Sequence, residues 1–124
     1  MSNDSTRTSS PAQAVWFDIS SRHPQRTQDF YRDLFGWSIS PLDGEDYAMV
    51  SAGDGPPSGG IGHATEGAPY VGLVPYFPVD DIQAALDRAA ELGATVVMQP
   101  APTPMGRIAA IRDLDGNTVG LQGP

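Results

Sequence analysis

The chain has 124 residues, a formal net charge of −8 and no cysteine. That length suits one compact domain and is too short for two independent ones, and the lack of cysteine excludes disulfides, thiolate nucleophiles and cysteine-based metal sites. The seven basic residues are all arginines scattered along an acidic chain, which argues against a nucleic-acid partner.

The first residues and the hydropathy pattern bear on location. No apolar run approaches the ~20 residues that a membrane-spanning helix needs, and residues 1–5 lack the apolar core of a signal peptide. We therefore expect a cytoplasmic protein with no membrane partner. Residues 1–12 are rich in serine and threonine without periodicity, which predicts a disordered tail and leaves residues 13–124 as a single domain.

The first predicted strand runs from Val15 to Ser20 and alternates with a period of two. One face is apolar and suits packing beneath a helix: Val15, Phe17 and Ile19. The other face combines an indole, a carboxylate and a hydroxyl: Trp16, Asp18 and Ser20. This second mixture favours a half-open cavity over a packed core.

An amphipathic helix is predicted next, from Pro24 to Phe35. Pro24 fits the first helical position, where a missing N–H is tolerated, and Gly36 supplies the C-terminal stop. Short strands are then predicted at residues 37–40, 47–51 and 60–64, separated by turns rich in glycine and proline.

The second half repeats this order. An apolar run from Val71 to Val79, interrupted by two prolines, predicts an edge or bulged strand, and Asp80 or Asp81 caps a helix that ends at Gly93. Further strands are predicted at residues 95–98, 107–111 and 118–121. Strand, helix and three strands thus occur twice, as module one (13–66) and module two (67–124), which predicts an α+β fold.

Two short segments carry a family resemblance. Residues 30–37 read Phe-Tyr-Arg-Asp-Leu-Phe-Gly-Trp, and residues 113–117 read Asp-Leu-Asp-Gly-Asn. With Val79-Asp80-Asp81 before the second helix, these segments resemble the signatures of the vicinal oxygen chelate superfamily, which includes glyoxalase I, extradiol dioxygenases and bleomycin-resistance proteins. Leu114 departs from the usual proline of the closing turn. The resemblance covers about Val15 to Gln122 and implies tandem βαβββ modules that form a U-shaped cup, in a homodimer.

The resemblance also locates the metal-ligand positions of that superfamily. Its enzymes bind a divalent metal in the cup with His and Glu from strands one, four, five and eight. Counting from the matched motifs, three of these positions fall at Trp16, Val74 and Gly120, and none of these side chains coordinates a cation. The strand-four position lies within residues 59–63, where His63 is the one candidate ligand. The other histidine, His23, falls at the first helix cap and is interpreted as structural. We predict no metal cofactor, because a lone imidazole does not hold a catalytic metal.

Without these ligands the cup is predicted to be an apolar, aromatic cavity for a planar molecule. Trp16 offers a stacking surface, and Asp18 and Tyr76 share the inner face as polar groups. Residues 102–106 are predicted to be flexible, with Met105 as an adaptable lid and Arg107 near the cup mouth. The predicted ligand-binding residues, with no catalytic residue assigned, are Trp16, Asp18, Trp37, Tyr47, Met49, Val74, Tyr76, Met105, Arg107 and Gly120.

Several of these residues have a second interpretation that the sequence leaves open. Trp37 and Tyr47 equally suit a core or a subunit interface, and an arginine at a strand start, such as Arg107, is more often solvated.

Three functions follow from this prediction. The first is a non-catalytic protein that sequesters a planar aromatic compound, such as an antibiotic, as the self-resistance members of the superfamily do. The alternative is a metal-independent enzyme acting on a biosynthetic intermediate, with Asp18 as general base, because burial beside an indole raises the pKa of a carboxyl. A divalent-metal lyase or dioxygenase is disfavoured by the missing ligands, and the fold alone does not choose among the three.

Overall fold

The computed structural model describes residues 11–44, 46–104 and 106–124. Most of the predicted tail, residues 1–10, lies outside the described residues, as does Met105. The described chain divides into two compact units. The first unit is Trp16–Val74, and the second comprises Pro75–Pro124 with residues 11–15.

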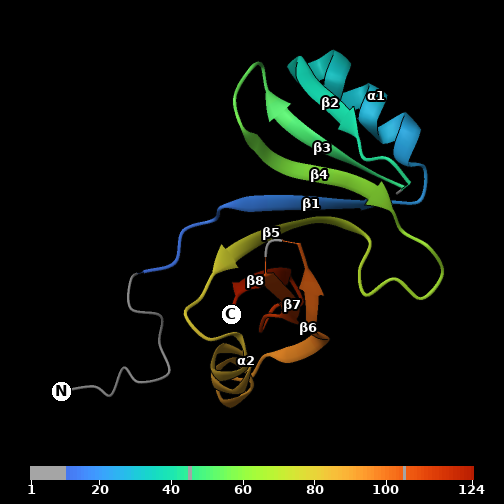
Figure 1. Cartoon of the computed structure of the whole chain (residues 1–124). Coiled ribbons are helices and arrows are strands. Elements are labelled where there is room, and N and C mark those ends of the chain that lie inside the picture. Colours follow the sequence, from blue (N-terminus) through green and yellow to red (C-terminus); the bar gives the residue numbers. More distant parts are fainter. Residues whose placement is uncertain (1–10, 45, 105) are drawn as a thin grey trace. The chain divides into compact units, whose positions relative to one another are not determined.

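The first unit contains one helix across one face of a sheet (Figure 1). Its elements in chain order are β1 (Trp16–Ser21), α1 (Pro24–Phe35), β2 (Trp37–Pro41), β3 (Tyr47–Ala52) and β4 (Pro57–His63). The strands are ordered β2-β3-β4-β1, with β1 parallel to β4 and the other neighbours antiparallel. This arrangement leaves the sheet with a face covered by α1 and a face without a helix.

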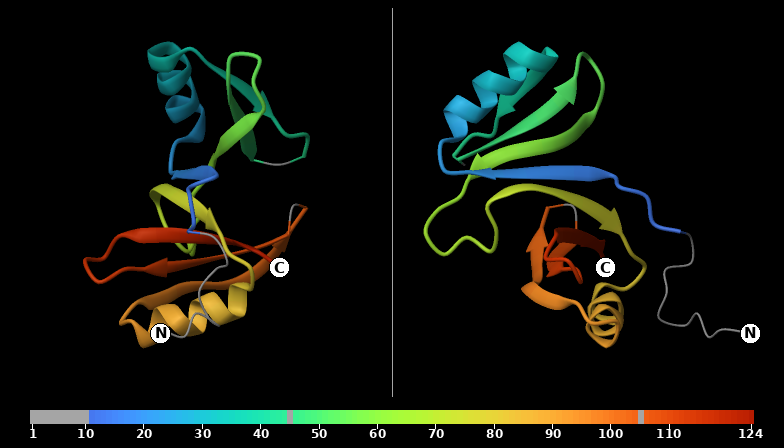
Figure 2. Two further views of the ribbon diagram at one scale, coloured as in Figure 1. Left: turned by 90° about the vertical axis from the view of Figure 1, so that its left-hand side faces the viewer. Right: turned by 180° about the vertical axis from the view of Figure 1, so that it is seen from behind.

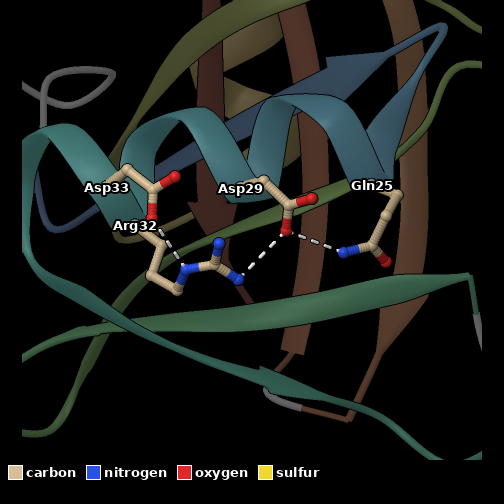
Figure 3. A network of polar contacts seen from close by, with 4 residues as sticks. All are labelled: Gln25, Asp29, Arg32 and Asp33. Carbon is tan, nitrogen blue, oxygen red and sulfur yellow. Dashed lines mark hydrogen bonds and ion pairs between the residues drawn. The ribbon is translucent and has the colours of Figure 1, made fainter.

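Helix α1 has the ends that the sequence predicts. Pro24 occupies its first turn, and Gly36 closes it in the left-handed conformation (φ 71°), donating its N–H to the carbonyl of Arg32. On its exposed surface Asp29 accepts hydrogen bonds from Gln25 and Arg32, at 2.9 and 3.1 Å, and Arg32 also reaches Asp33 (Figure 3). Such exposed pairs are screened by solvent and contribute little to stability, so they support the helix without deciding the fold.

The core of the first unit lies between α1 and the sheet. Ile19, Val50 and Ile61 are buried there. The half-buried residues packed against them are Phe17, Tyr31, Trp37 and Ile39. Phe17 and Ile19 therefore confirm the predicted helix-facing side of the first strand. Val15 does not join them, because it precedes β1 and is exposed.

The second unit repeats the order of the first, as Figure 2 also shows. Its elements are β5 (Gly72–Pro78, which begins in the first unit), α2 (Ile82–Glu91), β6 (Thr95–Thr103), β7 (Gly106–Arg112) and β8 (Thr118–Gly123). The strand order is β5-β8-β7-β6, with β5 parallel to β8. Asp81 caps α2 by accepting the N–H of Ala84 at 3.0 Å. The buried core against α2 is Ile82, Leu86, Ala109 and Leu121.

Two strands are longer than the sequence predicts. Strand β4 begins at Pro57 instead of Gly60, and β6 runs to Thr103 instead of ending at Met98. The pairing of β6 with β7 shifts between Val96 and Met98 and again between Met98 and Ala101, and these irregularities hide the two-residue period. In the segment predicted to be flexible, Pro102 and Thr103 belong to β6 and Gly106 to β7, and Thr103 pairs with Gly106.

The elements confirm the predicted α+β class and the twice-repeated order of one strand, one helix and three strands. Among the described residues, neither helix has the length and apolar character that crossing a membrane requires.

Candidate functional site

A carboxylate held by two phenols stands on the helix-free face of the first unit. Asp18 lies in β1 between Phe17 and Ile19, whose side chains pack toward α1, so its own side chain points to the opposite face. Tyr47 donates its hydroxyl to Oδ1 of Asp18 at 3.0 Å, and Tyr70 donates to Oδ2 at 2.7 Å. The Asp18 carboxyl is thereby fixed by residues from two other segments of the chain.

The ring of Tyr47 reaches Asp18 by lying across two glycines of β4. Gly62 is the strand partner of Tyr47, and Gly60 is the partner of Asp18. A Cβ on Gly62 would lie 2.6 Å from Cδ1 of Tyr47, and a Cβ on Gly60 would overlap the Tyr47 hydroxyl. Glycines two apart on one face thus leave the space through which the ring passes.

The same face carries two further predicted site residues. Met49 pairs with Gly60, which also pairs with Asp18, so Met49 and Asp18 lie in one row across the sheet. Trp16 lies two residues before Asp18 in β1 and shares its face by strand alternation. Both side chains are half-buried. Trp16, Asp18, Tyr47 and Met49 are therefore brought onto one surface.

Trp37 lies on the other side of this sheet. Its ring is 5.2 Å from that of Tyr31 on α1 and 5.3 Å from that of Phe17, centroid to centroid. These contacts place Trp37 in the core beneath α1. The core was one of the interpretations that the sequence left open for Trp37, beside a role in ligand binding.

In the second unit, a tyrosine ring again covers a glycine. Tyr76 of β5 pairs with Gly120 of β8, and a Cβ on Gly120 would overlap the Tyr76 ring. Both residues are buried, so the backbone of Gly120 is covered by an aromatic ring and is not bare. Val74, two residues before Tyr76, is buried as well.

Arg107 stands apart from Tyr76 and Gly120. It is exposed, pairs with Pro102 and Gly123, and shares the α2-facing side of β7 with Ala109 by alternation.

The two histidines occupy unrelated positions. His23 is the N-cap residue of α1 and makes no side-chain cap bond. His63 is exposed at the end of β4, where its Nδ1 lies 3.0 Å from a carboxylate oxygen of Asp46. Throughout residues 11–44, 46–104 and 106–124, no three His, Cys, Asp or Glu side chains gather in a way that could hold a metal ion.

Comparison with known proteins gives the family. Residues 13–121 match the model of the Glyoxalase/Bleomycin resistance protein/Dioxygenase superfamily. The chain belongs to this superfamily. The resemblance predicted from the Phe30–Trp37 and Asp113–Asn117 segments is thereby confirmed.

Two curated relatives are similar at comparable identity. The putative glyoxylase CFP32 of Mycobacterium tuberculosis is 31% identical over 106 residues, which is 82% of this chain and 40% of that protein. The anthracycline biosynthesis protein DnrV of Streptomyces peucetius is 31% identical over 124 residues, 86% of this chain and 45% of that protein. The chain therefore spans less than half the length of these relatives.

Solved structures of the superfamily share the fold. A variant of Streptomyces coelicolor methylmalonyl-CoA epimerase has a TM-score of 0.62 at 20% identity, covering 92% of this chain and 98% of that one. A hypothetical protein from Bacillus halodurans C-125 has a TM-score of 0.64 at 13% identity, covering 93% and 96%. At these identities the likeness shows the fold alone.

Tyr70 is the site residue of this superfamily member that the sequence analysis missed. It lies outside regular structure, between β4 and β5, and 52 positions separate it from Asp18. No periodicity marks such a contact. The alternating Gly60 and Gly62 did carry a usable signal, because glycines two apart in a strand indicate that another group approaches the backbone closely.

The environment of Asp18 leads to a prediction about stability. Burial raises its pKa, and the hydrogen bonds from Tyr70 and Tyr47 oppose that effect only in part. The folded chain then holds this proton more tightly than the unfolded chain, so the free energy of unfolding falls as the pH rises from about 3.8 through the folded pKa. Each pKa unit corresponds to about 1.4 kcal/mol.

We therefore expect Asp18→Asn to be more stable than the unaltered protein at pH 7, with the advantage shrinking toward acid pH. Urea unfolding of both proteins across this pH range measures the difference. Asp46→Asn, which removes a carboxylate from the exposed His63 pair, is the matched control. An Asp18→Asn advantage that does not change with pH would contradict the prediction.

Proposed function

We propose that this superfamily member is a small-molecule binding protein that sequesters a planar aromatic compound without using a metal. The observation that carries the proposal is the helix-free face of the first unit, where Asp18 accepts hydrogen bonds from Tyr47 and Tyr70. A fixed polar group flanked by Trp16 and Met49 is the composition typical of ligand sites, in which apolar contacts supply affinity and few polar groups set orientation.

Energetics favour a ligand at this face over a purely structural role. A half-buried carboxylate costs stability when it is charged, as the raised pKa of Asp18 reflects. Groups held at such a cost are concentrated at functional sites. A planar ligand would gain about 25 cal/mol per Å² of apolar area buried and about 0.5–1.5 kcal/mol more for an aromatic stack.

The names of the two relatives point to different functions, one to the binding proposal and one to the enzyme alternative. One relative is called an anthracycline biosynthesis protein, and anthracyclines are planar polycyclic aromatics, the ligand class that the sequence predicts. Another is called a putative glyoxylase, which favours the enzyme alternative. Because the chain spans less than half of each, neither name transfers to it directly.

A fluorescence titration tests the binding proposal. Adding an anthracycline such as daunorubicin should quench tryptophan emission saturably, and calorimetry should give the same dissociation constant. Trp16→Leu should lose most of the quenching and weaken binding several-fold, since the aromatic stack that it removes is worth about 0.5–1.5 kcal/mol. Trp37→Phe is the matched control and should keep the affinity, because Trp37 packs beneath α1. Equal loss in both variants, or no saturable binding, would contradict the proposal.

The enzyme alternative is favoured by one observation, the raised pKa of Asp18, which suits a general base. Mass spectrometry of the compound after prolonged incubation separates the two functions. A binding protein returns the compound unchanged, whereas an enzyme returns a product that Asp18→Asn fails to make. Elemental analysis showing stoichiometric zinc, iron, manganese or nickel would favour the metal-enzyme alternative.

The predicted cytoplasmic location and homodimer stay predictions.

A further inference from the structure

The face around Asp18 is otherwise uncharged. By strand alternation it presents side chains from β1, β2 and β3 and two glycines from β4. These are Trp16, Asp18, Ser20, Ser38, Ser40, Tyr47, Met49 and Ser51, with Gly60 and Gly62 between them. Asp18 is the single ionisable acid or base in that set apart from the weakly acidic tyrosine. Among these strand residues, Asp18 therefore supplies the one full negative charge on a partly aromatic surface.

Asp18 has acceptor capacity left over. A carboxylate offers about four lone-pair sites, and the two phenols occupy one site on each oxygen. Both phenols donate to the carboxyl oxygens of Asp18. The remaining sites suit a further donor that approaches from the open face.

Among the described residues, no ion pair supplies a cation to this carboxylate. In the part of the chain that the structure describes, the ion pairs use Asp29, Asp33, Asp46 and Glu91, and none uses Asp18. The arginines of the first unit lie in the loop before α1 or on α1 itself: Arg22, Arg26 and Arg32. A half-buried carboxylate without a protein cation is completed most favourably by a charged donor from outside.

Resting on the proposed function above, we propose that the sequestered compound is cationic and that its protonated amine binds Asp18 while its planar part lies against Tyr47 and Trp16. The phenol and indole faces add attraction for the same cation. The net charge of −8 raises the local concentration of cations around the whole molecule. Charge, donor geometry and aromatic surface thus select one ligand class, an amine-bearing planar aromatic.

Two compounds that share one ring system and differ at a single amine test this inference. Daunorubicin carries a protonated amino sugar, and N-acetyldaunorubicin has the same ring system without the charge. The full-length protein should bind the amine about tenfold or more tightly than the amide, as expected for a charge-assisted hydrogen bond. Asp18→Asn should bind both compounds with the affinity that the unaltered protein has for the amide. Asp46→Asn makes the same change in net charge at an exposed pair and should keep the difference.

The outcomes separate this inference from the function on which it rests. Equal affinity of the unaltered protein for both compounds would overturn the amine preference and leave sequestration standing. Binding of neither compound would contradict sequestration itself, and the amine preference with it. A preference that Asp18→Asn retains would place the cation at another acid. Since the comparison of the two compounds uses the unaltered protein, it is informative even if a variant does not fold.

Discussion

Gly60→Ala is expected to abolish most ligand binding while leaving the protein folded. The new Cβ would overlap the Tyr47 hydroxyl, so the ring must leave its path across β4 and release Oδ1 of Asp18. Overpacking costs about 1–3 kcal/mol, and because Tyr47 is half-buried its ring can move outward, which favours the low end. We expect an affinity loss of about tenfold or more, because one of two groups that fix the carboxylate is gone.

Gly59→Ala is the matched control for Gly60→Ala. Gly59 is the neighbouring residue of β4 and faces the other side of the sheet, where a Cβ would overlap the ring of Phe17. This change should destabilise the core beneath α1 and leave the affinity of the folded fraction unchanged. Calorimetric titration together with urea unfolding of both variants measures the two effects. Equal affinity loss in both variants would show that general destabilisation, and not the displacement of Tyr47, weakens binding.

Local signals in the sequence predict most of the architecture. The bounds of α1 follow from Pro24 and Gly36, and the observed helix has those bounds. Alternation in the first strand separates Phe17 and Ile19 from Asp18, and the core confirms that separation. These predictions succeed because each depends on a few neighbouring residues whose backbone preferences and periodicity are strong.

The partners of the site residues are less predictable, because they are set by contacts between distant segments. Tyr70 meets Asp18 across 52 positions, and no local pattern announces such a pairing. From the sequence, Trp37 could belong to the ligand site or to the core. Its packing against Tyr31 and Phe17 assigns it to the core. The shifts in the pairing of β6 likewise depend on its neighbour β7, so the sequence of β6 alone ends the strand too early.

Gly120→Ala is expected to have the larger effect on stability. Its Cβ would overlap the ring of Tyr76, which is 2% exposed and so has less room to yield than Tyr47. We expect a loss near the upper end of the range of about 1–3 kcal/mol for overpacking. Urea unfolding measures the loss, and the first-unit ligand site should keep its affinity if its residues act as proposed.

A double-mutant cycle shows whether Tyr76 and Gly120 depend on each other. Tyr76→Ala alone should cost about 3–5 kcal/mol through the cavity it leaves. In Tyr76→Ala/Gly120→Ala the added methyl no longer meets a ring, so the double variant should be more stable than the sum of the single losses by about 0.5–3 kcal/mol. Strictly additive losses would contradict the interdependence. The family resemblance places a metal ligand at position 120. If Tyr76 and Gly120 are coupled, a single substitution of Gly120 by glutamate or histidine is blocked, because the longer side chain would first have to displace the ring of Tyr76.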